Sequence, residues 1–190
     1  MPILHALLRT LASGPLPVFC CWQDGYPESA RLYPDRCVVG GDRGTDGRLS
    51  RDMDTYILEI DPDPQLVPTA RMFAATVARQ LGCAEESVLD VKIAVSEACT
   101  NAVQAHVERN VPSPITLKVE EEASGLLYEV KDAGKGIDEI PAPPPEVFQR
   151  AVEEGPEDQG MGLALIRALF PAAEFLPQDE GTVVRFRIDR

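Results

Sequence analysis

The stretch VKIAVSEACTNAVQAH, residues 91–106, contains residues whose types and spacing could do chemistry. Glu97 and Asn101 are four residues apart, so on a helix their side chains lie one above the other and can act on a single ligand. A carboxylate beside a neutral amide oxygen suits a general base next to a hard cation such as Mg²⁺. A solvated polar face on an amphipathic helix is the alternative, and this stretch alone leaves both interpretations open.

A second candidate is DAGKG, residues 132–136, in which an acidic residue at the end of a predicted strand precedes two glycines. Asp132 can accept a hydrogen bond from an exocyclic amine. Gly134 and Gly136 allow the backbone to approach a flat ring closely or to adopt positive φ. An ordinary Asp-Gly turn has the same composition, so this motif alone is weak evidence for a site.

A third candidate is GMGL, residues 160–163, directly before a predicted helix. Gly160 and Gly162 at a helix start leave backbone N–H groups and the positive end of the helix dipole available to a phosphate. A flexible loop before a helix is the alternative. The chain has neither the GxGxxG pattern of a Rossmann site nor a GxxxxGK[ST] phosphate loop.

Hydrophobic periodicity predicts the elements that must position these groups. The predicted helices cover residues 66–81, 85–107 and 162–170. The predicted strands cover residues 55–60, 115–121, 126–132 and 182–188, the middle two forming a hairpin. The Pro-rich segment 137–159, with a short helix near 147–152, is long enough to predict a lid rather than a plain connection.

Composition restricts the class of partner. The 190-residue chain has a net charge of −13, and no apolar run approaches the roughly 20 residues of a membrane span. Such an acidic chain is a poor candidate for a nucleic-acid or anionic-membrane surface, although it can attract a basic protein. Five cysteines without CxxC spacing favour reduced thiols in a cytosolic protein over disulfides or a zinc site.

Residues 1–52 show no sustained period and are rich in Gly, Pro, Arg and Asp, the composition of a linker or disordered segment. Regular patterning begins after Met53. We therefore expect residues 1–52 to form an N-terminal extension and residues 53–190 to form one domain. The domain holds all of the net charge, with 12 Lys and Arg against 25 Asp and Glu.

The order of the motifs resembles that of the GHKL (Bergerat-fold) ATPases. Within that superfamily the chain resembles the anti-sigma-factor serine/threonine kinases of the RsbW and SpoIIAB type. SEACTNAVQAH is similar to their N box, DAGKGID to their first glycine box and GMGLALIRALF to their second, and a Gly-Thr pair opens the last predicted strand. The resemblance covers residues 53–190.

The resemblance implies a role for each matching residue. Glu97 would be the base that activates the attacking hydroxyl, Asn101 the Mg²⁺ ligand, and Asp132 the acceptor for the adenine amino group. The other implied site residues shape the nucleotide pocket: Gly134 and Gly136 at its floor, Gly160, Gly162 and Leu163 over the phosphates, and Thr182 beside the adenine.

Two features depart from the family pattern. The family often has a His four residues after the Asn, whereas here Ala105 occupies that position and His106 follows it. Between the two glycine boxes the only cation is Arg150, so neutralisation of phosphate must depend on Mg²⁺, Lys135 and backbone amides.

The resemblance implies an α+β fold, a two-layer α/β sandwich with a mixed, mostly antiparallel sheet and helices on one face. It implies a cytoplasmic ATP- and Mg²⁺-dependent serine/threonine kinase that regulates transcription, with a sigma factor and a STAS-type anti-sigma-factor antagonist as partners. A homodimer stays open, and direct contact with nucleic acid or membrane is not expected. The alternative is a nucleotide-gated module that sequesters its partner without phosphoryl transfer. The ATPase half of a histidine kinase fits less well, because no helical pair with a phospho-acceptor His is predicted before the domain.

Overall fold

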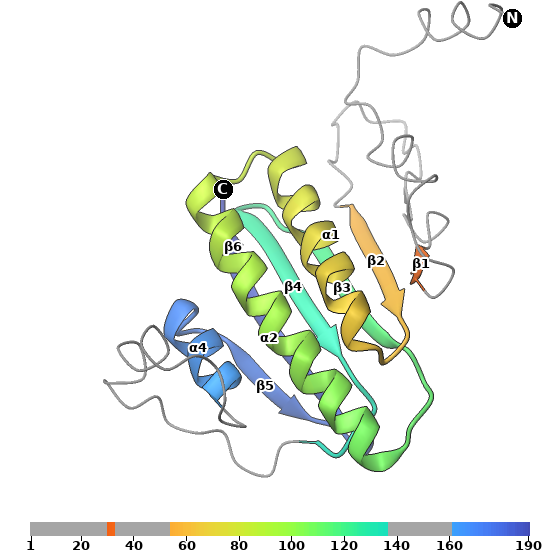
Figure 1. Ribbon diagram of the computed structural model, residues 1–190. Coiled ribbons are helices and arrows are strands. Elements are labelled where there is room, and N and C mark those ends of the chain that lie inside the picture. Colours follow the sequence, from red (N-terminus) through yellow and green to blue (C-terminus); the bar gives the residue numbers. More distant parts are fainter. Residues whose placement is uncertain (1–29, 33–53, 137–160) are drawn as a thin grey trace, which may run out of the picture.

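The computed structural model describes residues 30–32, 54–136 and 161–190. These residues form two layers, a six-stranded sheet and helices that cover one of its faces (Figure 1). In spatial order the strands are β1 (Ala30–Leu32), β2 (Thr55–Ile60), β3 (Ile115–Glu121), β4 (Gly125–Lys131), β6 (Thr182–Asp189) and β5 (Glu174–Pro177). Every described pair of neighbouring strands is antiparallel. The predicted two-layer α+β architecture is confirmed.

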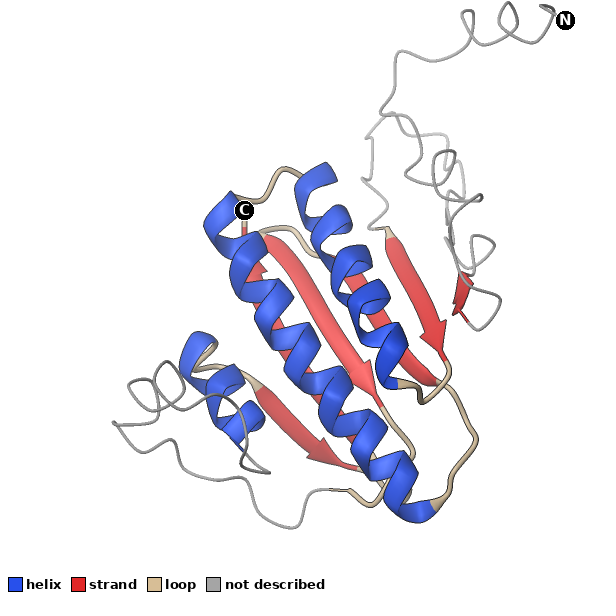
Figure 2. Cartoon of the chain, viewed as in Figure 1, coloured by secondary structure: helices blue, strands red, loops and turns tan. Residues whose placement is uncertain are grey.

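The helices cover one face of the sheet (Figure 2) and pack on it through buried apolar side chains. Its members are η2 (Pro64–Leu66), α1 (Val67–Gln80), α2 (Glu85–Arg109) and α4 (Met161–Leu169). The predicted apolar face of α2 is buried: Val88, Val91, Val95, Ala98 and Ala102. With 25 residues, α2 is about 37 Å long and runs along the sheet between α1 and α4. Helix α2 therefore packs against both other long helices, α1 and α4.

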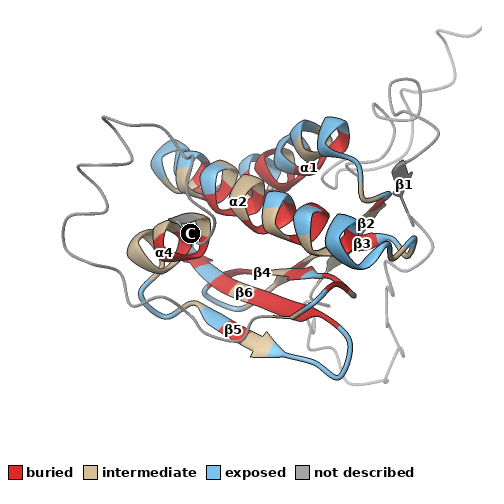
Figure 3. Cartoon of the chain, turned by 60° about the horizontal axis from the view of Figure 1, so that its bottom comes forward, coloured by how far each residue is buried: buried red, intermediate tan, exposed pale blue. Residues whose placement is uncertain are grey.

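The inner face of the sheet carries the alternate apolar side chains that the period of two predicted. The buried residues of β2 and β6 on this face are Tyr56, Leu58, Ile60, Val184, Phe186 and Ile188. Figure 3 shows these buried positions between the strands and the helices. Cys99 of α2 is fully buried in the same core, and burial raises the pKa of its thiol to about 12. It is a small core residue, as predicted.

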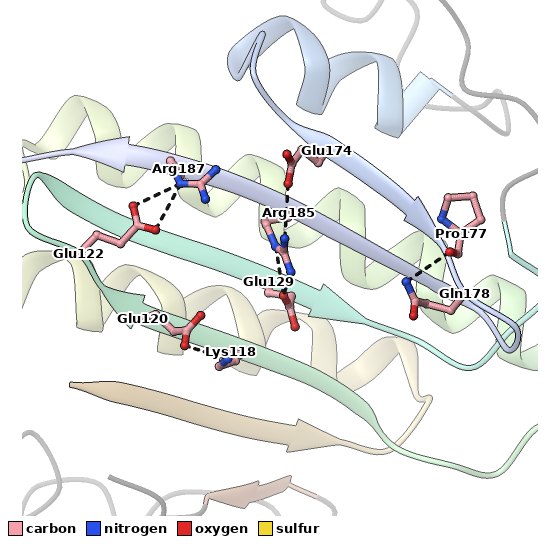
Figure 4. Close-up of polar contacts among 9 residues, drawn as sticks. All are labelled: Lys118, Glu120, Glu122, Glu129, Glu174, Pro177, Gln178, Arg185 and Arg187. Carbon is pink, nitrogen blue, oxygen red and sulfur yellow. Dashed lines mark hydrogen bonds and ion pairs between the residues drawn. The ribbon is translucent and has the colours of Figure 1, made fainter. Parts of the chain in front are cut away.

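The opposite face of the sheet carries ion pairs (Figure 4). Arg185 on β6 lies 2.7 Å from Glu129 on β4 and 3.5 Å from Glu174 on β5. Arg187 lies 3.2 Å from Glu122. These side chains are partly exposed, so each pair contributes at most about 1 kcal/mol to stability. This face is polar, as expected for an antiparallel sheet with one side towards solvent.

Three features of the fold differ from the sequence-based expectation. Strand β1, Ala30–Leu32, lies within the segment for which no regular structure was predicted, and it pairs with β2. Strand β5 was missed because its four residues, with only Phe175 buried, are too short to show a period. Helix α2 continues to Arg109, two residues beyond its predicted end. The predicted lid and its short helix lie outside the described residues, as does Gly160.

None of the described helices combines the length and the apolar composition that crossing a membrane requires.

Candidate functional site

The three candidate motifs meet at one cavity of about 160 Å³. It lies between the C-terminal half of α2, the residues that follow β4, the start of α4 and the start of β6. Its walls include five of the predicted site residues: Asn101, Asp132, Gly136, Leu163 and Thr182. Pockets that hold drug-sized ligands measure about 300–1,000 Å³. The described residues therefore enclose only part of a ligand of that size.

The first turn of α4 lies against Glu97 and Asn101 of α2. A Cβ atom on Gly162 would lie 2.5 Å from Oε2 of Glu97 and 3.2 Å from Nδ2 of Asn101. The absence of a side chain at Gly162 leaves the space that the Glu97 carboxylate occupies. Because the first turn of a helix has free N–H groups and the positive end of the dipole, an anion bound there would lie next to both side chains.

Glu97 has the properties of a proton acceptor. Its side chain is half-buried, and burial raises the pKa of its carboxyl above the ordinary value of 4.5. No residue in the described part of the chain donates a hydrogen bond to it or forms an ion pair with it. A carboxylate whose pKa is raised towards the working pH is a stronger base.

Asn101 contains a polar atom that the described residues do not satisfy. Its Nδ2 is buried and has no hydrogen-bond partner among the described residues. A buried donor without a partner costs about 1–3 kcal/mol. The amide lines the cavity, so a ligand with acceptor oxygens could satisfy it.

Asp132 lies at the end of β4 and is 7% exposed. Its Oδ1 accepts the N–H of Gly134 at 2.7 Å, and its own N–H donates to the carbonyl of Thr182 at 3.0 Å. Burial raises the pKa of the Asp132 carboxyl, and the bond from Gly134 partly opposes that rise. The backbone N–H of Thr182 also faces this carboxyl and lowers its pKa slightly, and the carboxyl lines the cavity, where it can accept a further donor.

Gly134 brings the segment after β4 onto α2. A Cβ atom on Gly134 would collide with both the side chain and the backbone of Ala105. The residue must therefore be glycine because of its contact with a helix. The close approach to a ligand ring that the sequence suggested for Gly134 stays a prediction. Gly136 and the exposed Lys135 follow it along the cavity wall.

Comparisons with known proteins identify the family of the chain. Residues 60–188 match the family described as histidine kinase-like ATPase domain. The chain is 35% identical over 117 residues to the anti-sigma F factor of Thermoanaerobacter sp.. The matched segment covers 61% of this chain and 80% of that protein. It is 33% identical over 131 residues to the serine-protein kinase RsbW of Bacillus cereus, 67% of this chain and 79% of that protein.

The chain belongs to the anti-sigma-factor kinase family of GHKL ATPases. A second RsbW, from Listeria innocua, is 31% identical over 134 residues, which is 69% of this chain and 84% of that protein. The resemblance stated from the motifs is thereby confirmed. ATP binding follows from the family, whereas the role of each site residue stays a prediction.

The residues of this kinase-family chain fit the Mg²⁺ that ATP-binding sites use. The described residues contain no group of three or more His, Cys, Asp or Glu that could hold a metal by themselves. Mg²⁺ bound with a nucleotide needs only one or two protein ligands, because phosphate and water supply the others. Asn101 lies at the cavity wall, and its amide oxygen is of the ligand type that Mg²⁺ takes, whereas the unsatisfied Nδ2 could donate to a phosphate oxygen.

Three residues that hold the site together were not singled out from the sequence. Gly181, with φ of +86°, lies directly against the backbone of Asp132. The only feature of the sequence that indicated a role for it was the Gly-Thr pair before the last strand. His106 accepts the N–H of Ala133 at 2.9 Å. Arg109 donates to the carbonyl of Gly134 at 3.0 Å. The family pattern gave no role for His106, because it is one position later than the usual His.

Proposed function

We propose that the chain binds ATP with Mg²⁺, transfers the γ-phosphoryl group to a Ser or Thr of an anti-sigma-factor antagonist, and binds a sigma factor. The observation that carries this proposal is the contact between Glu97 and Gly162. It puts a carboxylate of raised pKa at the helix start where a phosphate would bind. The names of the relatives, anti-sigma F factor and serine-protein kinase RsbW, support the kind of partner.

Each side chain has a defined task in the proposed reaction. The acceptor hydroxyl oxygen forms a bond to the γ-phosphorus, the bond from that phosphorus to the oxygen of ADP breaks, and Glu97 takes the hydroxyl proton. The carboxyl of Asp132 accepts a hydrogen bond from the adenine amino group. The Asn101 oxygen would hold Mg²⁺, which would neutralise phosphate charge. Positioning and charge neutralisation supply most of the rate.

The surface next to Glu97 is compatible with a protein as the acceptor. Ile93 and Leu89 lie one and two helical turns before Glu97 on α2, and they are 40% and 55% exposed. A protein segment that brings a hydroxyl to Glu97 would cover these apolar side chains. Both proposed partners and ATP occur in the cytoplasm, which is where this function places the chain.

A nucleotide-gated module without phosphoryl transfer is the second candidate. Lys135 is the only Lys or Arg among the described residues that line the cavity. A site with one cation provides little stabilisation for charge that develops on a transferring phosphoryl group. Such a site could bind ATP and use it only to control partner binding.

Thermal unfolding with ATP or ADP, each with and without Mg²⁺, tests the nucleotide site common to both candidates. Binding to the folded state alone stabilises it by about 2.7 kcal/mol when the ligand is at one hundred times its Kd. We expect both nucleotides to raise the Tm, and to raise it more when Mg²⁺ is present. An unchanged Tm of the full chain at millimolar nucleotide would contradict the site.

A further inference from the structure

The C-terminal end of α2 is tied to the segment Asp132–Gly134 by two side chains. The N–H of Ala133 donates to Nε2 of His106 at 2.9 Å, and Nη1 of Arg109 donates to the carbonyl oxygen of Gly134 at 3.0 Å. His106 and Arg109 are three residues apart on α2, so they point to the same side of the helix. Together they hold the peptide group before Ala133 and the peptide group after Gly134, on either side of the Ala133–Gly134 bond.

The hydrogen-bond partners of His106 define the state of its ring. The side chain is 1% exposed. Because the Ala133 N–H is a donor, Nε2 is the acceptor, and Nδ1 therefore carries the proton. That proton is donated to the carbonyl oxygen of Val111, 3.2 Å away. His106 thus connects the end of α2 to the segment after β4 through both ring nitrogens.

The turn that ends α2 fixes the orientation of the ring. Asn110 adopts the left-handed conformation, with φ of 54°. This brings the N–H of Val111 to within 3.0 Å of the carbonyl oxygen of His106, as in a Schellman turn. Val111 therefore bonds both the backbone and the ring of His106. The ring is held in place from the helix side, independently of its bond to Ala133.

We propose that His106 and Arg109 are positioning residues for recognition of the adenine ring. They hold Ala133 and Gly134 against α2, and Gly134 in turn donates to Oδ1 of Asp132. This chain of contacts sets where the carboxyl of Asp132 lies at the cavity wall. The small side chain of Ala105 lies directly against Gly134 and leaves room for this arrangement. The inference rests on the proposed ATP site.

Two substitutions of His106 separate positioning from a structural role. The amide oxygen of His106→Gln reaches the place of Nε2 and can accept the Ala133 N–H, while the bond to Val111 is lost. The shorter His106→Asn can keep the bond to Val111 but cannot reach Ala133. Each variant loses one hydrogen bond, so we expect similar losses of unfolding free energy. We expect a Kd for ATP near the wild-type value in His106→Gln and about tenfold higher in His106→Asn. Equal Kd values in the two variants would overturn the proposal.

Hydrogen exchange of the Ala133 amide in the nucleotide-free chain provides a readout that does not depend on ATP. We expect slow exchange in the wild type and in His106→Gln, and fast exchange in His106→Asn. If the wild type binds no ATP, the proposed function fails, whereas unchanged exchange in His106→Asn overturns this inference. Arg109→Ala should weaken ATP binding by several-fold. The matched control is Arg71→Ala, which removes an exposed arginine on α1 and should leave the Kd unchanged.

Discussion

The backbone of Gly162 on α4 lies against the carboxylate of Glu97 on α2, so a side chain at Gly162 would occupy the place of that carboxylate. Alanine favours a helix over glycine by about 1 kcal/mol. The Glu97 side chain is flexible and can move aside at small cost. We therefore expect Gly162→Ala to leave the free energy of unfolding within about 1 kcal/mol of the wild type but to slow phosphoryl transfer.

Urea unfolding and a transfer assay on the same preparation of Gly162→Ala check this prediction. If the free energy of unfolding fell by several kcal/mol, the contact between Gly162 and Glu97 would be part of the rigid core. Transfer at the wild-type rate would mean that the position of the carboxylate does not matter.

The half-buried carboxyl of Glu97 predicts a pH-dependent stability. Burial raises its pKa in the folded state above 4.5, so this carboxyl contributes stability that is present below pH 4.5 and lost as the pH rises through the raised pKa. The side chain of the Glu97→Gln variant is uncharged at every pH, so the variant does not lose this stability as the pH rises. We expect the nucleotide-free variant to be more stable than the wild type at pH 7 and equal to it near pH 4.

Urea unfolding of both proteins from pH 4 to pH 8 measures this difference. A Glu97→Gln variant that is less stable than the wild type at pH 7 would show that the carboxylate has a stabilising partner.

The fold was largely predictable because its signals are local. The alternation in β2 and β6 and the apolar face of α2 each depend on a few neighbouring residues. The motif residues Asn101 and Asp132 were likewise recognisable by type and spacing. These patterns were sufficient to predict most elements and several residues that line the cavity.

The contacts that hold the site were not predictable, because they join segments far apart in the sequence. The sequence does not show that Gly134 faces Ala105 or that His106 receives the Ala133 N–H. Strand β1 depends on pairing with β2 rather than on a period of its own. Such features follow from tertiary packing, which composition and periodicity do not report.

Asp132→Asn should weaken recognition of adenine without destabilising the nucleotide-free fold. The Asn oxygen can still accept the N–H of Gly134, and the raised pKa shows that the buried charge is itself unfavourable. In place of Oδ2, however, the amide nitrogen would face the adenine amino group, donor against donor. We expect the Kd for ATP to rise about tenfold or more.

Titration calorimetry with ATP and with inosine triphosphate, whose ring has a carbonyl oxygen in place of the amino group, tests the specificity of Asp132. The preference for ATP should shrink or reverse in the Asn variant. An unchanged preference would place the adenine elsewhere.

Residues 1–52 are predicted to be dispensable for nucleotide binding. All described residues that line the cavity lie between Ala98 and Val184, and β1 contributes only three residues at the edge of the sheet. A chain that starts at Met53 should therefore bind ATP with a Kd within about threefold of the full chain. Calorimetry on both proteins checks this, and aggregation or loss of binding would show that the first 52 residues support the domain.

Transfer of label from γ-labelled ATP with Mg²⁺ to a candidate STAS-type antagonist tests whether the chain is a kinase. We expect a phosphorylated Ser or Thr on the antagonist with the wild type. With Glu97→Gln we expect ATP binding at wild-type affinity and transfer slower by about 10²–10⁴-fold. A wild-type chain that binds ATP and a sigma factor in a nucleotide-dependent way, yet transfers no label to any such antagonist, would contradict the kinase and leave the nucleotide-gated module.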